Sequence, residues 1–213
     1  MTLGTTAILV CSHTAISGPT QVMLDACRRD GAQLQTLYGV SDIALARNRI
    51  LTVSLEAIKR TTLDTVLLID DDISAPLSHV QELVHESRSR KLPVSGVYAN
   101  AEGIPNAIEW PLTGKWLTGL GFIAIPVAAL EALKARTVEG NSGEDIKLFC
   151  QSGYHVERPG FWTSEDYWLC LQLGGVMLAP IPADHYKRVP VHVSRETAEA
   201  FVRRTPESTL VQL

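Results

Sequence analysis

The feature that most constrains the fold is a short apolar run at 65–69 that ends directly in three aspartates, Asp70, Asp71 and Asp72. Uninterrupted runs of this length are typical of strands that are buried on both faces of a parallel sheet. Similar strand patterns recur along the chain and alternate with helix patterns that begin after prolines or capping residues. This alternation predicts an α/β fold with a mostly parallel central sheet flanked by helices.

The expected elements follow in regular order. Strands are expected at 7–11, 33–38, 65–69, 93–98, 119–125 and 176–181, and helices at 19–29, 43–58, 76–90, 127–134, 165–173 and 196–203. Residues 136–162 are rich in glycine with weak periodicity, which predicts a long loop or flap. The tail from 184 onward shows a short helix pattern but no clear strand signal.

Composition excludes several classes of protein. With 213 residues, 46% hydrophobic and 20% charged, the chain can bury a core without disulfides or structural metal. The four cysteines stand singly, which predicts reduced, buried thiols rather than a zinc site. No apolar run approaches the roughly 20 residues that span a bilayer, and the start lacks the basic residues of a signal peptide, so we expect a cytoplasmic protein without a membrane span. The net charge of −4 argues against non-specific nucleic-acid binding as the main role.

The three aspartates that follow the apolar run point to a cation. Adjacent carboxylates repel one another, and a divalent ion would offset that repulsion. Mg²⁺ or Mn²⁺ binds one or two carboxylates and leaves its other positions to water and to a substrate's phosphates, which would place a diphosphate beside this loop. The alternative is a solvated turn in which the aspartates cap a helix starting near Pro76.

A second acid pair, Glu165 and Asp166, stands at the start of an expected helix. A structural role is the first alternative, because Thr163 and Asp166 have the spacing of a capping box and acids are common in the first turn. The flanking aromatic residues, Trp162 and Tyr167 among them, favour a functional role, because such residues stack on sugar rings.

Six segments, in this order, resemble the small bacterial and phage glycosyltransferases of the GT-A fold. They are Ala46–Arg49, Leu67–Ile73, Val94–Tyr98, Thr118–Phe122, Ser164–Trp168 and Leu173–Gly175. The resemblance covers about residues 5–185 and implies a single GT-A-like catalytic domain over 1–185, with a C-terminal tail over 186–213 that packs on the same domain. One departure is at the end, where the family usually has a histidine followed by glycine and His185 is followed by Tyr186.

The resemblance implies a metal site. In the family, the aspartates of a D-x-D motif bind the metal that holds a nucleotide-diphosphate sugar. Asp70 and Asp72 have that spacing, and a register with Asp71 and Asp72 stays open. His185 or His192 would complete the metal shell. The implied cofactor is Mn²⁺ or Mg²⁺.

The resemblance also implies a base and a set of donor contacts. In inverting members the acid pair supplies the base that deprotonates the acceptor hydroxyl, which would be Asp166 beside Glu165. A carboxylate in an apolar-walled site can have a raised pKa that suits this role. The residues expected at the nucleotide-sugar donor are Ser12, Thr14, Arg47, Asp70, Asp71, Gly119 and Gly121.

Together these features predict a metal-dependent glycosyltransferase. It would move a sugar from a nucleotide-diphosphate donor to a hydroxyl of a carbohydrate, a lipid-linked acceptor or a modified nucleobase. A nucleotidyl- or phosphotransferase of related fold is one alternative, although the sequence has neither G-x-x-x-x-G-K-[ST] nor G-x-G-x-x-G. A non-catalytic nucleotide-sugar-binding protein is the other.

Overall fold

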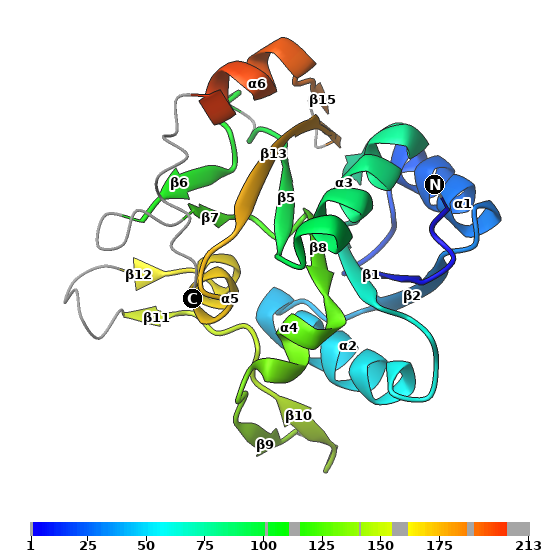
Figure 1. Ribbon diagram of the computed structural model, residues 1–213. Coiled ribbons are helices and arrows are strands. Elements are labelled where there is room, and N and C mark those ends of the chain that lie inside the picture. The colour runs from blue at the N-terminus through cyan, green and yellow to red at the C-terminus, as the bar shows by residue number, and fades with distance from the viewer. Residues whose placement is uncertain are drawn as a thin grey trace.

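A six-stranded sheet forms the centre of the molecule (Figure 1). The computed structural model describes residues 2–100, 102–110, 116–140, 142–154, 162–186 and 190–203. The strand order is β13-β5-β8-β3-β1-β2, and only β8 runs antiparallel to its neighbours. The strands are β1 Thr6–Ser12, β2 Gln33–Tyr38, β3 Thr65–Asp70, β5 Val94–Val97, β8 Phe122–Pro126 and β13 Met177–Pro182. The predicted α/β fold with a mostly parallel sheet is confirmed.

The two strands at the centre of the parallel half are buried on both faces. In β1, Ile8 and Val10 belong to one core cluster, whereas Ala7 and Leu9 belong to the other. The apolar run in β3 divides in the same way between the two clusters. This double burial is the physical reason that both strands read as uninterrupted apolar runs.

Helices cover both faces of the sheet (Figure 1). Helices α1 and α3 pack into one core cluster, and α2, α4 and α5 pack into the other. α6 packs against the edge strand β13. The helices are α1 Gly18–Arg29, α2 Ile43–Ile58, α3 Leu77–Arg90, α4 Val127–Ala132, α5 Glu165–Gln172 and α6 Arg195–Arg203. None of the helices in the described part of the chain is long and apolar enough to cross a membrane.

Short strands outside the central sheet complete the fold. β4, β14 and β15 form a small sheet in which β14 is the middle strand, and the other short strands pair as β6 with β7, β9 with β10 and β11 with β12. Their bounds are β4 Ile73–Ser74, β6 Ala107–Glu109, β7 Trp116–Thr118, β9 Thr137–Glu139, β10 Asp145–Lys147, β11 Gly153–Tyr154, β12 Trp162–Thr163, β14 Asp184–Tyr186 and β15 Pro190–Val191.

Three sequence expectations differ from the structure. The strand expected at 119–125 is wrong at its start, because β7 ends at Thr118 and β8 begins only at Phe122. The loop expected at 136–162 contains the β9–β10 and β11–β12 pairs, while 141 and 155–161 lie outside the described residues. The tail contributes β14 and β15 although no strand was expected there. Strands of two or three residues are too short to produce a detectable period.

Candidate active site

A pocket of about 700 Å³ opens at the carboxyl edge of the parallel strands. Its wall is built from the loops that follow β1, β2, β3, β5 and β7, together with a residue of β6, the first two turns of α2, the start of α5 and a residue of β14. This edge is where open α/β sheets bind ligands, and the volume lies in the range of small-molecule sites. The pocket therefore collects residues that are far apart in the sequence.

Main-chain hydrogen bonds from three different segments fix the three aspartates. The Asp70 amide donates to the Gly121 carbonyl at 3.1 Å. The Asp71 carbonyl accepts from the Ser17 amide at 2.8 Å, and the Asp72 carbonyl accepts from the Tyr186 amide at 2.6 Å. All three aspartates line the pocket.

The aspartates do not cap the helix that follows them. α3 begins at Leu77 after Pro76, and no side chain makes a capping hydrogen bond there. The alternative in which the acids serve as helix caps is therefore wrong. Burial raises the pKa of Asp71, and the nearby Ser12 hydroxyl partly offsets this effect.

The pairing of β4 with β14 brings His185 to the aspartates. Because β4 directly follows the acids and His185 pairs with Ile73, the imidazole Nε2 lies 3.2 Å from Asp72 Oδ2. Nδ1 lies 2.8 Å from the Ala99 carbonyl, which can only accept, so Nδ1 carries a proton and Nε2 faces the carboxylate. His192 lies elsewhere, exposed and 2.9 Å from Asp184. Of the two predicted histidines, the structure brings only His185 to the acids.

The Asp72–His185 pair suits two neighbouring ligands of one octahedral ion. At metal–ligand distances of about 2.1 Å and a right angle, two donor atoms are about 3 Å apart. Within the described residues, no group of three His, Cys, Asp or Glu side chains is arranged to hold a metal. A divalent ion with two protein ligands, and with water and phosphate oxygens in its other positions, fits these residues.

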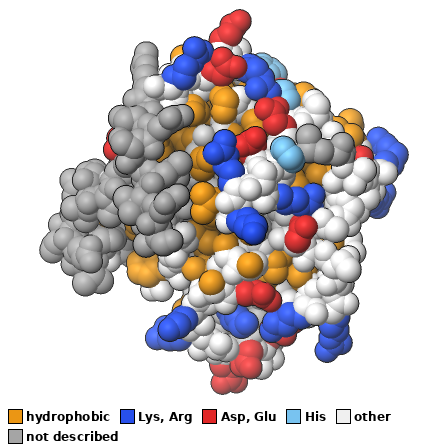
Figure 2. All heavy atoms as spheres, viewed as in Figure 1, with side chains coloured by type: hydrophobic (Ala, Val, Ile, Leu, Met, Phe, Trp, Pro, Cys, Tyr) orange, Lys and Arg blue, Asp and Glu red, His pale blue; other side chains and the backbone are white. Residues whose placement is uncertain are grey.

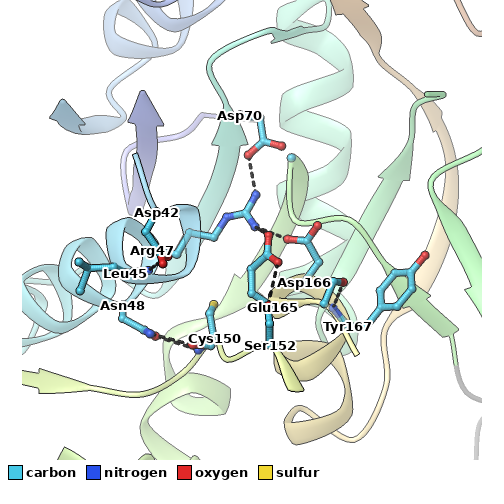
Figure 3. A network of polar contacts seen from close by, with 12 residues as sticks. Asp42, Leu45, Arg47, Asn48, Asp70, Cys150, Ser152, Glu165, Asp166 and Tyr167 are labelled. Carbon is cyan, nitrogen blue, oxygen red and sulfur yellow. Dashed lines mark hydrogen bonds and ion pairs between the residues drawn. The ribbon is translucent and has the colours of Figure 1, made fainter. Parts of the chain in front are cut away.

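Arg47 connects the end of β3 to the start of α5 (Figure 3). Its Nη2 donates to Asp70 Oδ1 at 2.8 Å, and its Nη1 donates to Glu165 Oε1 at 3.1 Å and to Asp166 Oδ1. Only 5% of the Arg47 side chain is exposed. Burial lowers the pKa of Arg47, but Asp166 and Asp70 outweigh burial and raise it well above its ordinary value. This guanidinium is therefore a permanent buried cation among three carboxylates.

Asp166 stands in the first turn of α5 and lines the pocket. The helix is capped by Ser164, whose Oγ accepts from the Tyr167 amide at 3.5 Å, so the predicted capping box between Thr163 and Asp166 is wrong. Burial raises the pKa of Asp166 to about 6, against the opposing effect of the Arg47 charge. At neutral pH this carboxylate is mostly ionised and can accept a proton.

Glu165 has different surroundings from its neighbour. Its Oε1 binds Arg47, and its Oε2 lies 3.5 Å from Ser152 Oγ. Glu165 is not part of the pocket wall, whereas Asp166 is. Both acids are counter-ions of Arg47, but only Asp166 also lines the pocket.

The predicted donor residues are only partly brought together. Ser12, Arg47, Asp70, Asp71 and Gly119 line the pocket, whereas Thr14 and Gly121 do not. Arg47 was predicted to face a nucleotide, but its guanidinium forms ion pairs with three carboxylates of the chain itself.

The two glycines make room for neighbouring side chains. A Cβ at Gly121 would lie 2.6 Å from Asp70 Oδ2, and a Cβ at Gly119 would collide with the Tyr98 hydroxyl. Both glycines are therefore required by the packing around Asp70 and Tyr98.

Tyr98 is a site residue to which the sequence assigned no role. Its hydroxyl accepts from the Gly121 amide at 3.1 Å, and its ring packs edge-on to His185 with centroids 5.6 Å apart. Burial, together with Asp70 and Asp166, raises the pKa of Tyr98 well above its ordinary value, so the phenol stays protonated. A tyrosine that directly follows an apolar strand was the available signal, but its contacts come from distant segments.

Comparison with known proteins gives a fold but no family. No family model matches the sequence, and no curated protein is significantly similar to it. Among solved structures, A197 from STIV matches with a TM-score of 0.59 and 16% identity, over 89% of this chain and 94% of that chain. This match covers nearly all of both chains, so the two proteins share a fold.

Two further solved structures are less similar. A glycosyltransferase involved in glycosylation of the major capsid of PBCV-1 matches with a TM-score of 0.37 and 15% identity, over 59% of this chain and 62% of that chain. The 4-diphosphocytidyl-2C-methyl-D-erythritol synthase from Anaerococcus prevotii matches with a TM-score of 0.41 and 10% identity, over 94% and 98% of the two chains. These TM-scores do not by themselves establish a shared fold. The comparisons thus establish a fold shared with A197, and any proposal about function depends on the geometry of the pocket.

Proposed function

We propose that the protein is a divalent-metal-dependent glycosyltransferase that uses a nucleotide-diphosphate sugar. The observation that carries the proposal is that one pocket holds both an Asp72–His185 pair suited to a metal and Asp166, a carboxylate with a raised pKa. Glycosyl transfer needs both parts, since a cation stabilises the leaving diphosphate and a base takes the proton of the acceptor.

The donor would lie along the carboxyl edge of the sheet. Its nucleoside would occupy the end formed by the loops after β1 and β2, where Ser12, Val40 and Ile43 line the pocket. Its diphosphate would lie near Asp72 and His185. A Mn²⁺ or Mg²⁺ ion held there would act as a Lewis acid on the diphosphate oxygens.

The chain's own residues supply the proton acceptor. The acceptor oxygen forms a bond to the anomeric carbon of the sugar, while the bond from that carbon to the diphosphate oxygen breaks and its electron pair leaves with the nucleoside diphosphate. The acceptor proton passes to Asp166. Arg47, which binds Oδ1, holds this carboxylate in the pocket. A single displacement of this kind inverts the configuration at the anomeric carbon.

Two variants test the proposal. Asp166→Asn removes the base, and Asp72→Asn removes a metal ligand without touching Arg47. We expect each to lower the rate of sugar transfer by about 10²–10⁴-fold, with thermal unfolding still cooperative. Asp25→Asn is a matched control, because Asp25 lies on α1 outside the pocket.

The products distinguish the proposal from its alternatives. Release of free nucleoside diphosphate together with a glycosylated acceptor supports a glycosyltransferase. Release of pyrophosphate would instead indicate a nucleotidyltransferase. Full transfer activity in Asp166→Asn and Asp72→Asn would overturn the proposed roles of these residues.

A further inference from the structure

The loop after β5 forms the end of the pocket wall opposite the β1 and β2 loops. Hydrogen bonds fold this loop tightly: the Asn100 amide donates to the Ile104 carbonyl at 2.9 Å, and Asn100 Oδ1 accepts from the amides of Ile104 at 2.9 Å and Glu102 at 3.1 Å. A β-bridge joins Ala99 to Pro105. The described residues on either side of position 101 thus have their own hydrogen-bond pattern.

A second set of hydrogen bonds ties the base of the loop to the sheet. The Asn106 amide donates to the Tyr98 carbonyl at 3.0 Å, and the Tyr98 amide donates to Asn106 Oδ1 at 3.1 Å. Asn106 Nδ2 also donates to Thr118 Oγ1 at 3.0 Å on β7. These contacts anchor both ends of the loop to the described core.

This loop and β6, the strand that follows it, carry large apolar side chains that are exposed to solvent. Ile104 is 59% exposed and Ile108 is 39% exposed, yet both line the pocket together with Pro105. Hydrogen bonds and the pairing of β6 with β7 restrain the backbone here, which favours a constant position of these side chains at the pocket. A rigid apolar surface beside a polar pocket is the form of a preorganised binding site.

The sheet order sets this wall apart from the donor end of the pocket. β1 and β2 lie at one end of the order, β3 with its aspartates is in the middle, and β5 lies beyond β8 on the other side. A nucleoside at the β1–β2 end and a diphosphate near Asp72 would leave the β5 side for the molecule that receives the sugar. This step rests on the proposed function.

The charges around the pocket favour an uncharged acceptor. Its centre carries Asp70, Asp71, Asp72 and Asp166, and Arg47 is the only lysine or arginine among its described lining residues. On the face shown in Figure 2, the described basic and acidic side chains are interspersed, without a large basic patch. A polyanion such as DNA would meet repulsion rather than a basic groove here.

We propose that Ile104, Pro105 and Ile108 form the acceptor subsite. It takes an uncharged acceptor whose reacting hydroxyl is carried beside an aryl or alkyl group. The apolar group packs on the isoleucines, and the hydroxyl then reaches toward Asp166. The acceptor class is therefore an apolar glycoside or lipid-type alcohol rather than a bare sugar or a nucleic acid.

The test compares matched acceptors on matched variants. Transfer from the sugar nucleotide that the wild type turns over best is measured with methyl, phenyl and octyl glucosides, and with DNA containing hydroxymethylcytosine. Ile104→Ser and the double variant I104S/I108S are compared with Val53→Ser, which removes an apolar side chain that is 66% exposed on α2, outside the pocket. Hydrolysis of the donor without acceptor reports the donor site alone.

We expect the wild type and Val53→Ser to prefer phenyl and octyl glucosides over methyl glucoside by about tenfold in kcat/KM. The double variant should lose this preference through a higher acceptor KM, with donor KM and donor hydrolysis unchanged. A preference that survives in the double variant, a change in donor KM, or a preference for the DNA would each overturn the acceptor subsite. Absence of donor turnover in the wild type would overturn the proposed function itself, which separates the two failures.

Discussion

Two groups of side chains at and beside the pocket contain acids, and these acids have different partners. Asp70, Glu165 and Asp166 share the guanidinium of Arg47, a cation that the chain itself supplies. Because the Arg47 side chain is nearly fully buried, these ion pairs are largely shielded from solvent and need no ligand to form. We therefore expect this group to stabilise the folded protein as well as to take part in the proposed reaction.

The second group is Asp72 with His185. Here the partner is an imidazole whose Nε2 lies 3.2 Å from Asp72 Oδ2. An added divalent ion would complete this group. The difference teaches that acids adjacent in the sequence can have separate roles: Asp70 is held by an internal cation, whereas Asp72 is the residue for which we propose an external one.

The largest expected effect is on stability, from removing the internal cation. Arg47→Met leaves three carboxylates without their shared partner, and breaking a buried ion pair by removing one member costs about 3–5 kcal/mol. We expect a loss of that size in the free energy of unfolding, measured by urea denaturation. Arg60→Met, at an exposed position just after α2, should change it by no more than about 0.5 kcal/mol. Equal stability of both variants would show that Arg47 does not hold the first group together.

A smaller effect is expected from the second group, and it concerns the metal rather than the fold. His185→Ala should weaken activation by Mn²⁺ by about 10–100-fold while leaving the unfolding transition cooperative. His192→Ala is the matched control, because that side chain is exposed and contacts Asp184 instead. Equal Mn²⁺ titration curves for the two variants would contradict the role given to His185.

The smallest expected effect is a gradual loss of activity as the pH falls. Burial raises the pKa of Asp166 to about 6, and only the ionised form can take a proton, so kcat/KM should fall about tenfold for each unit below pH 6. The sign for stability is opposite: with the folded pKa raised, the contribution of Asp166 to stability is present at low pH and lost as pH rises through about 6. Rates that stay constant down to pH 4.5 would contradict this.

Local patterns predicted much of the fold and part of the site. The apolar run before Asp70 and the helix start at Ser164 follow from short-range rules for buried strands and helix starts, and Asp70 and Asp166, which stand beside these features, line the pocket. These rules work because strand burial and helix capping depend on neighbours within a few residues.

The contacts that decide roles could not be predicted in this way. Arg47 meets Asp166 across 119 positions of the chain, and no local pattern specifies which carboxylates a buried arginine will bind. His185 reaches Asp72 only because β14, three residues long, pairs with β4, which has two. Such short strands depend on tertiary contacts rather than on periodicity, so only the structure shows that His185, and not His192, lies beside Asp72.

Calorimetric titration of sugar nucleotides tests the central claim most directly. The account predicts that at least one donor binds wild-type protein with Mn²⁺ present, that binding weakens by tenfold or more when the metal is removed with EDTA, and that Asp72→Asn binds equally weakly with or without Mn²⁺. Donor binding that is indifferent to both Mn²⁺ and Asp72, or no binding of any sugar nucleotide, would contradict it.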